Sequence, residues 1–137
     1  MGGEWPLNHL DWLASRGIAV LVNLTEHAYR DDRFRIHRIP VPDGAAPGER
    51  QIQRFCALVR RALQDETPVY AHCLAGCGRT GTVMACYLVY ADRLGARDAI
   101  ERVRELRPCS IETDVQLEAV TAWAWRMRQT GYRLAVT

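Results

Sequence analysis

The sequence predicts a single α/β domain, with a central, largely parallel sheet flanked by helices. Short apolar runs rich in β-branched residues alternate with longer segments whose apolar residues recur at helical spacing. The chain has 137 residues, of which 48% are hydrophobic, and this suffices for one domain with a substantial core. We therefore expect one domain over residues 1–137, with its core at about 7–129.

Three strands are expected. Residues 18–24 are nearly all apolar, as in a strand covered on both faces, whereas residues 33–39 alternate apolar side chains with Arg and His, as in a strand nearer the sheet edge. A third apolar run, 68–71, leads into His72 and Cys73. We expect this run to be a central strand, with Cys73 at its carboxyl end, where ligands bind in parallel α/β sheets.

Five helices are expected around these strands. Asn8 can cap the first helix, which Gly17 ends, and the second follows Pro47 and ends near Gln64. The remaining three run from Arg79 to a break at Gly95, from there to Pro108, and from near Thr113 to Gln129.

Composition argues against several functions and locations. The net charge of +2 is too small and dispersed for a nucleic-acid-binding surface, although all 18 basic residues are Arg. The longest apolar run, 83–91, is too short to span a membrane, and the N-terminus lacks a signal-peptide pattern. We expect a soluble, cytoplasmic monomer. The five cysteines, odd in number and without a C-x-x-C pair, predict neither a disulfide framework nor a zinc site.

The segment 69–81 carries the chemistry. A strand ends at His72-Cys73, a loop follows, and Arg79-Thr80 opens a helix. Backbone N–H groups in such a turn, together with the positive end of the helix, bind anions, and the same field favours the thiolate form of Cys73. The five residues between Cys73 and Arg79 let the backbone form a ring of donors across which the guanidinium binds two phosphate oxygens.

The predicted phosphate-binding residues are Leu74, Ala75, Gly76, Cys77, Gly78 and Arg79. Glycine at two of these positions permits a close approach of the backbone to the anion. A rhodanese-like sulfur-transfer loop is an alternative, because it also holds a cysteine in an anion-binding turn. It would not need Arg79, nor an acid on another loop.

The pattern H-C-x-x-G-x-G-R-T-G at 72–81, with S-I-E-T at 110–113, resembles the protein tyrosine phosphatase superfamily, and within it the small atypical dual-specificity phosphatases. The resemblance covers about 7–127. It implies the family's fold, a cysteinyl-phosphate intermediate, and neither cofactor nor metal. It also implies that Thr80 donates a hydrogen bond to the Cys73 sulfur, that His72 fixes the loop, and that phosphate, sulfate or vanadate can bind there.

Cleavage of a phosphate ester needs an acid to protonate the leaving oxygen. Asp43, thirty residues before Cys73 in the turn V-P-D-G-A-A-P, is the candidate. On the residues alone it reads as an ordinary turn aspartate before Gly44, and the resemblance to the family's general-acid loop is what favours the acid. Asp31 and Asp32 are the alternatives.

A water-positioning residue is expected near 110–116. Alignment with the family's glutamine-containing loop puts Glu112 where a catalytic Gln would lie. Gln116 is the alternative. A third possibility is that neither residue positions the water, because Thr113-x-x-Gln116 is also the pattern of a helix capping box.

The expected substrates are phosphotyrosine in proteins, phosphoserine or phosphothreonine if the site is shallow, and small aryl phosphates. A phosphoinositide phosphatase is an alternative, although these place lysines in the loop and this chain has no Lys. A non-catalytic phosphate-binding module is another. Cys77 either forms a reversible disulfide with Cys73 that protects the nucleophile, or is a small loop residue that points away from the anion.

Overall fold

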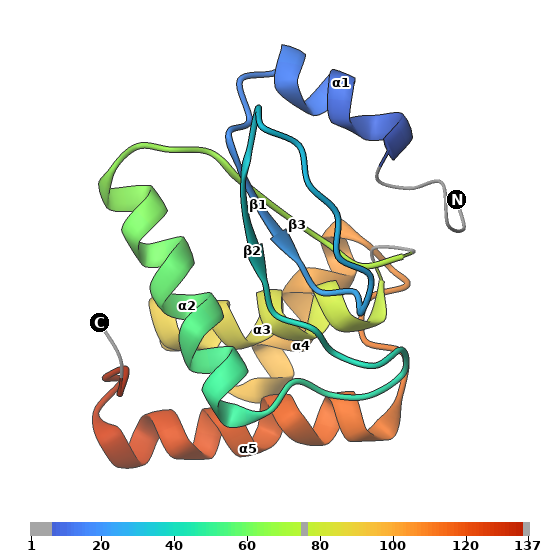
Figure 1. Ribbon diagram of the computed structural model, residues 1–137. Coiled ribbons are helices and arrows are strands. Elements are labelled where there is room, and N and C mark those ends of the chain that lie inside the picture. Colours follow the sequence, from blue (N-terminus) through green and yellow to red (C-terminus); the bar gives the residue numbers. More distant parts are fainter. Residues whose placement is uncertain (1–6, 75–76, 136–137) are drawn as a thin grey trace.

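A computed structural model describes residues 7–74 and 77–135 of the chain. The predicted α/β class is confirmed: three strands and five helices occur in this part of the chain (Figure 1). In chain order they are α1 (Leu7–Ser15), β1 (Val20–Asn23), β2 (Arg35–Arg38), α2 (Glu49–Gln64), β3 (Val69–His72), α3 (Gly78–Asp92), α4 (Ala96–Leu106) and α5 (Asp114–Thr130).

The strands form one parallel sheet in the order β2-β1-β3. β1 lies in the middle because its residues from Leu21 onward are apolar or fully hydrogen-bonded, and they are completely buried. β2 lies at an edge, as predicted, with exposed Arg35 and Arg38. The expectation that β3 is central is wrong. Among the described strands it forms the other edge, and its residues 69–71 are only half-buried.

Helices cover both faces of the sheet. Residues paired in one row point to the same face, so Leu21, Ile36 and Tyr70 pack with Leu10 and Leu13 of α1. The next row points the other way, where Val22 and Ala71 pack with Phe55 of α2 and Val83 of α3.

Behind α3 lies a third layer made of α4 and α5 (Figure 1). Trp123 of α5 packs into it and donates a hydrogen bond from Nε1 to the carbonyl oxygen of Cys86, at 2.9 Å. Cys56 and Cys86 are buried free thiols in this core. α3 is thus packed between the sheet and the layer of α4 and α5.

The predicted bounds hold to within a few residues. The first helix begins at Leu7, so Asn8 lies inside it and is not its cap as expected. Gly17 follows its end with a φ of +80°, a left-handed conformation that glycine adopts without strain. Within 7–74 and 77–135, no helix has the length and apolar character needed to cross a membrane.

Candidate active site

The residues predicted to carry the chemistry meet at the carboxyl edge of the sheet. Cys73 directly follows β3, and α3 begins at Gly78, so the loop between them joins a strand end to a helix N-terminus. Leu74 of this loop is half-buried. Two other predicted phosphate-binding residues, Ala75 and Gly76, lie outside the described part of the chain.

Cys73 is buried, with 3% of its surface exposed, and its thiol is free. The Thr80 hydroxyl donates a hydrogen bond to its sulfur at 3.0 Å. This is the contact that the sequence resemblance implied. It is available because Thr80 lies in the first turn of α3, which begins beside the end of β3.

Arg79 is buried at 4% exposure and contacts the loop that carries Asp43. One guanidinium nitrogen donates to the carbonyl oxygen of Val41 at 2.8 Å. The other lies 3.6 Å from a carboxylate oxygen of Asp43, whose side chain is 79% exposed. The structure therefore brings Cys73, Arg79 and Asp43 to one place from two loops far apart in the sequence.

The turn at Asp43 has a definite backbone geometry. Ala45 donates its N–H to the carbonyl oxygen of Pro42 at 3.0 Å, and Gly44 has a φ of +80°. Because this conformation is strained for residues with a Cβ, glycine after Asp43 lets the turn present the carboxylate outward.

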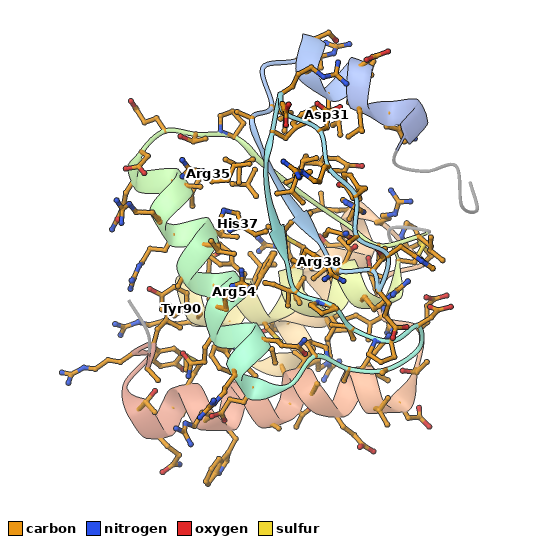
Figure 2. The ribbon with its side chains drawn as sticks, in the orientation of Figure 1. Asp31, Arg35, His37, Arg38, Arg54 and Tyr90 are labelled. Carbon is orange, nitrogen blue, oxygen red and sulfur yellow. A yellow bond between two sulfur atoms is a disulfide. The ribbon has the colours of Figure 1, made fainter. Side chains whose placement is uncertain are left out.

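The alternative acids lie at the other end of the sheet. Asp31 and Asp32 precede β2 and so lie toward the amino ends of the parallel strands, whereas Cys73 follows a carboxyl end. Figure 2 shows Asp31 beside α1. Its carboxylate pairs with Arg33 at 2.7 Å, and hydrogen bonds from Arg33 lower the pKa of Asp31 to about 2. Asp31 is thus held in an ion pair away from the loop.

His72 lies beneath the loop, 2% exposed. Its Nε2 forms a hydrogen bond with the Tyr29 hydroxyl at 2.6 Å, and its carbonyl oxygen accepts from Leu24 at 2.9 Å. Burial, and then the positive charge of Arg79, lower the pKa of His72 to about 4, so the imidazole is neutral at pH 7. No sequence pattern indicates this role for Tyr29, which is 43 residues away from His72.

The segment before α5 lies against the loop. A Cβ added to Gly78 would come within 2.5 Å of a Glu112 carboxylate oxygen and 3.0 Å of the Gln116 amide. Any side chain at position 78 would therefore require the Glu112 carboxylate to move and the Gln116 amide to shift slightly. Both candidates for positioning a water thus lie beside the phosphate loop, Glu112 exposed and Gln116 fully buried.

Gln116 also forms the predicted capping box of α5. Its Oε1 accepts from the backbone N–H groups of Glu112 and Thr113, at 2.8 and 3.2 Å. The Thr113 hydroxyl accepts in turn from the Gln116 N–H at 3.3 Å. The Gln116 side chain therefore has a structural role independent of any water.

One prediction about the cysteines is wrong. The structure contains a disulfide between Cys77 and Cys109, 32 residues apart, while Cys73 is free. The expected reversible disulfide between Cys77 and Cys73 is therefore wrong, because Cys77 is bonded to Cys109 instead. The physical reason is that residues 109–111 run beside the loop: Ile111 donates its N–H to the Cys77 carbonyl oxygen at 3.3 Å, and this proximity is invisible in the sequence spacing.

Comparisons with known proteins identify the family. A family model described as "Polymorphic toxin system, DSP-PTPase phosphatase" matches residues 6–93, more than half of the chain. Mouse dual specificity protein phosphatase CDC14B is 31% identical over 114 residues, which are 77% of this chain and 22% of that protein. The crystal structure of Tk-PTP in the active form is 28% identical, with a TM-score of 0.79 over 92% of this chain and 88% of that chain.

The crystal structure of DUSP15, 20% identical, has the same fold, with a TM-score of 0.79 over 93% of this chain and 83% of that chain. The chain spans about a quarter of the length of the first curated relatives that it matches. The resemblance seen in the sequence is confirmed at the level of family and fold. The chain belongs to the dual-specificity phosphatases of the protein tyrosine phosphatase superfamily.

Proposed function

We propose that this domain is a cysteine-dependent protein phosphatase that hydrolyses phosphotyrosine, and also phosphoserine or phosphothreonine, through a cysteinyl-phosphate intermediate. The observation that carries the proposal is the convergence of Cys73, Thr80, Arg79 and Asp43, with the Thr80 hydroxyl 3.0 Å from the Cys73 sulfur and Asp43 3.6 Å from Arg79. This arrangement supplies a nucleophile, a phosphate clamp and an acid within one site.

In the first step, the Cys73 thiolate attacks phosphorus in line with the leaving oxygen. Arg79 and the backbone N–H groups of the loop bind the equatorial oxygens, where charge develops. Asp43 protonates the departing tyrosine oxygen, which forms the free hydroxyl as the P–O bond breaks and the S–P bond forms. The exposure of the Asp43 side chain gives it access to a phosphoprotein bound at the mouth of the loop.

In the second step, water attacks the cysteinyl phosphate and releases inorganic phosphate and the Cys73 thiolate. Asp43, now ionised, takes a proton from that water. Thr80 stabilises the thiolate as a leaving group by its hydrogen bond to sulfur. We assign the positioning of the water to Glu112, because its carboxylate lies over Gly78 and is exposed, whereas the Gln116 amide is already occupied.

The substrate class follows from the family and from the loop. CDC14B is named a dual specificity protein phosphatase, and Tk-PTP shares the fold over most of this chain. Leu74 and Cys77 stand at loop positions that the signature H-C-x-x-G-x-G-R-T-G leaves open, and neither carries a charge; the chain contains no Lys. The backbone and Arg79 therefore bind the phosphate without help from other loop side chains. Because the loop has no further positive charge for a polyanionic inositol phosphate, a protein substrate is favoured.

We also propose that the domain acts as a monomer in the cytoplasm, and that its loop binds phosphate, sulfate or vanadate. The Cys77–Cys109 disulfide bears on location, because structural disulfides are typical of oxidising compartments. If the protein is exported, the cytoplasmic location is wrong. If it stays in the cytoplasm with Cys77 and Cys109 oxidised, it is an exception to the rarity of structural disulfides there.

The test is hydrolysis of 4-nitrophenyl phosphate and of a phosphotyrosine peptide by the full chain. Cys73→Ser should abolish turnover yet still bind vanadate or phosphate, because the loop and Arg79 remain. Cys56→Ala is the matched control, since it removes a buried thiol outside the site. Full activity in Cys73→Ser would show that the proposed function is wrong.

A further inference from the structure

The loop that carries Asp43 is held by the first turn of α5. The Thr113 hydroxyl donates a hydrogen bond to the carbonyl oxygen of Gly44 at 2.9 Å, and the Gln116 Nε2 donates to the carbonyl oxygen of Ala45 at 3.1 Å. These two carbonyls belong to the residues that directly follow Asp43. The contacts join positions 69 and 71 residues apart.

The same segment is fastened to the phosphate loop. The Cys77–Cys109 disulfide and the hydrogen bond from Ile111 N–H to the Cys77 carbonyl oxygen tie its beginning to that loop. Arg104 of α4 donates to the carbonyl oxygens of Ser110 and Ile111, at 3.0 and 2.8 Å, which fixes the segment from the other side. Residues 109–116 therefore form a strut between the loop with Cys73 and the loop with Asp43.

The contacts of the Asp43 side chain itself hold it only weakly. It is 79% exposed, and its ion pair with Arg79 is long, at 3.6 Å. Because the Asp43 partner lies in water and the separation is long, this pair contributes little to the placement of the carboxylate. The position of the Asp43 carboxylate thus depends on the backbone that follows it, and this backbone is what Thr113 and Gln116 hold.

We propose that Thr113 and Gln116 are positioning residues for the general acid: they set the distance between the Asp43 carboxylate and the leaving oxygen. The proposal rests on the proposed function, and it gives Gln116 a role different from the positioning of water. Gln116 has its Oε1 and Nε2 both engaged with backbone groups, and it is fully buried.

The consequence is a specific change in leaving-group dependence. A tyrosine phenol, with a pKa of about 10, needs a proton as it leaves, whereas the more acidic 4-nitrophenol needs one less. A displaced Asp43 should therefore lower kcat/KM for a phosphotyrosine peptide much more than for 4-nitrophenyl phosphate. A merely structural defect would lower kcat/KM for both substrates equally, because it would reduce the fraction of active enzyme.

Three substitutions of Thr113 separate its two hydrogen bonds. Serine keeps the donor to Gly44 and the acceptor for the α5 N-terminus. Aspartate keeps the acceptor, and so the helix cap, but cannot donate when ionised. Valine has neither. Thr121→Val is the matched control on the same helix, since the Thr121 hydroxyl donates to the Leu117 carbonyl oxygen, at 3.2 Å on the exposed side.

The measured quantity is the ratio of kcat/KM for the phosphotyrosine peptide to kcat/KM for 4-nitrophenyl phosphate. Complete removal of a general acid costs about 10²–10⁴-fold, so partial displacement should lower the ratio by about tenfold in Thr113→Asp and Thr113→Val. Thr113→Ser and Thr121→Val should stay within about twofold of the parent. An unchanged ratio in folded Thr113→Asp overturns the inference.

A double-mutant cycle with Asp43→Asn separates this inference from the proposed function. In the Asp43→Asn background, Thr113→Asp should cause no further fall in the ratio, because the group that it positions is gone. A further fall as large as in the parent overturns the positioning role alone. If Asp43→Asn leaves the ratio unchanged, the assignment of Asp43 as the acid is wrong, and the proposed mechanism fails with it.

Discussion

The two loops that meet in the site differ in how they are built. The loop with Cys73 is internal: Cys73 is 3% and Arg79 4% exposed, and both lie where a strand passes directly into a helix. The loop with Asp43 is external, with the carboxylate 79% exposed and held through contacts made by a distant helix. One half of the chemistry is thus fixed locally, and the other half by tertiary contacts.

This difference suits the proposed division of labour. A nucleophile and a phosphate clamp gain from burial and from a fixed geometry, because electrostatic stabilisation is strongest where water is excluded. An acid that must reach a leaving group on a protein surface gains from exposure. Arg79 belongs to both halves, since it contacts Val41 and Asp43 of the external loop from within the internal one.

The largest effect is therefore expected for Arg79→Lys. Lysine keeps the charge but loses the planar fork that binds two phosphate oxygens and contacts the Val41 carbonyl oxygen. We expect kcat/KM for 4-nitrophenyl phosphate to fall about 1000-fold, close to the cost of removing a donor to a developing oxyanion. Arg97→Lys, at an exposed ion pair on α4, is the control. A loss below about tenfold would show that charge alone suffices.

The sequence predicted the internal half well, because its contacts are local. Cys73 and Thr80 are seven residues apart, and the strand and helix that bring them together were placed to within a few residues. The external half needed the family resemblance, since Asp43 alone reads as a turn residue. The Cys77–Cys109 disulfide was missed because no spacing rule links two cysteines whose proximity arises from packing between α3 and the segment before α5.

The disulfide itself gives the second prediction. It closes a loop of 32 residues, and the restriction of the unfolded chain should stabilise the protein by about 3.5 kcal/mol. Cys109→Ser should lower the free energy of unfolding by about that amount, measured by urea titration without reductant. The parent with dithiothreitol should approach the same value. Equal stability of the parent and Cys109→Ser without reductant would mean that the bond does not form in solution.

The smallest of the three effects comes from His72, which supports the internal loop. Its pKa is lowered from 6.5 to about 4, chiefly by burial and then by Arg79, so between these values the unfolded chain binds a proton that the folded protein does not. Stability should therefore be unaffected by His72 above pH 6.5 and should fall as the pH drops toward 4, by about 3 kcal/mol in all.

This pH dependence can be separated from that of the carboxylates. Asp31, with its pKa lowered to about 2, loses its stabilising ionisation only below about pH 4, beneath the His72 window. The measurement is the urea midpoint at intervals from pH 7 to 4.5, for the parent and for His72→Gln. Glutamine can still form a hydrogen bond with the Tyr29 hydroxyl but does not titrate. An equally steep fall in both proteins would assign the acid sensitivity to another group, and would leave the internal loop without the pH dependence that its burial implies.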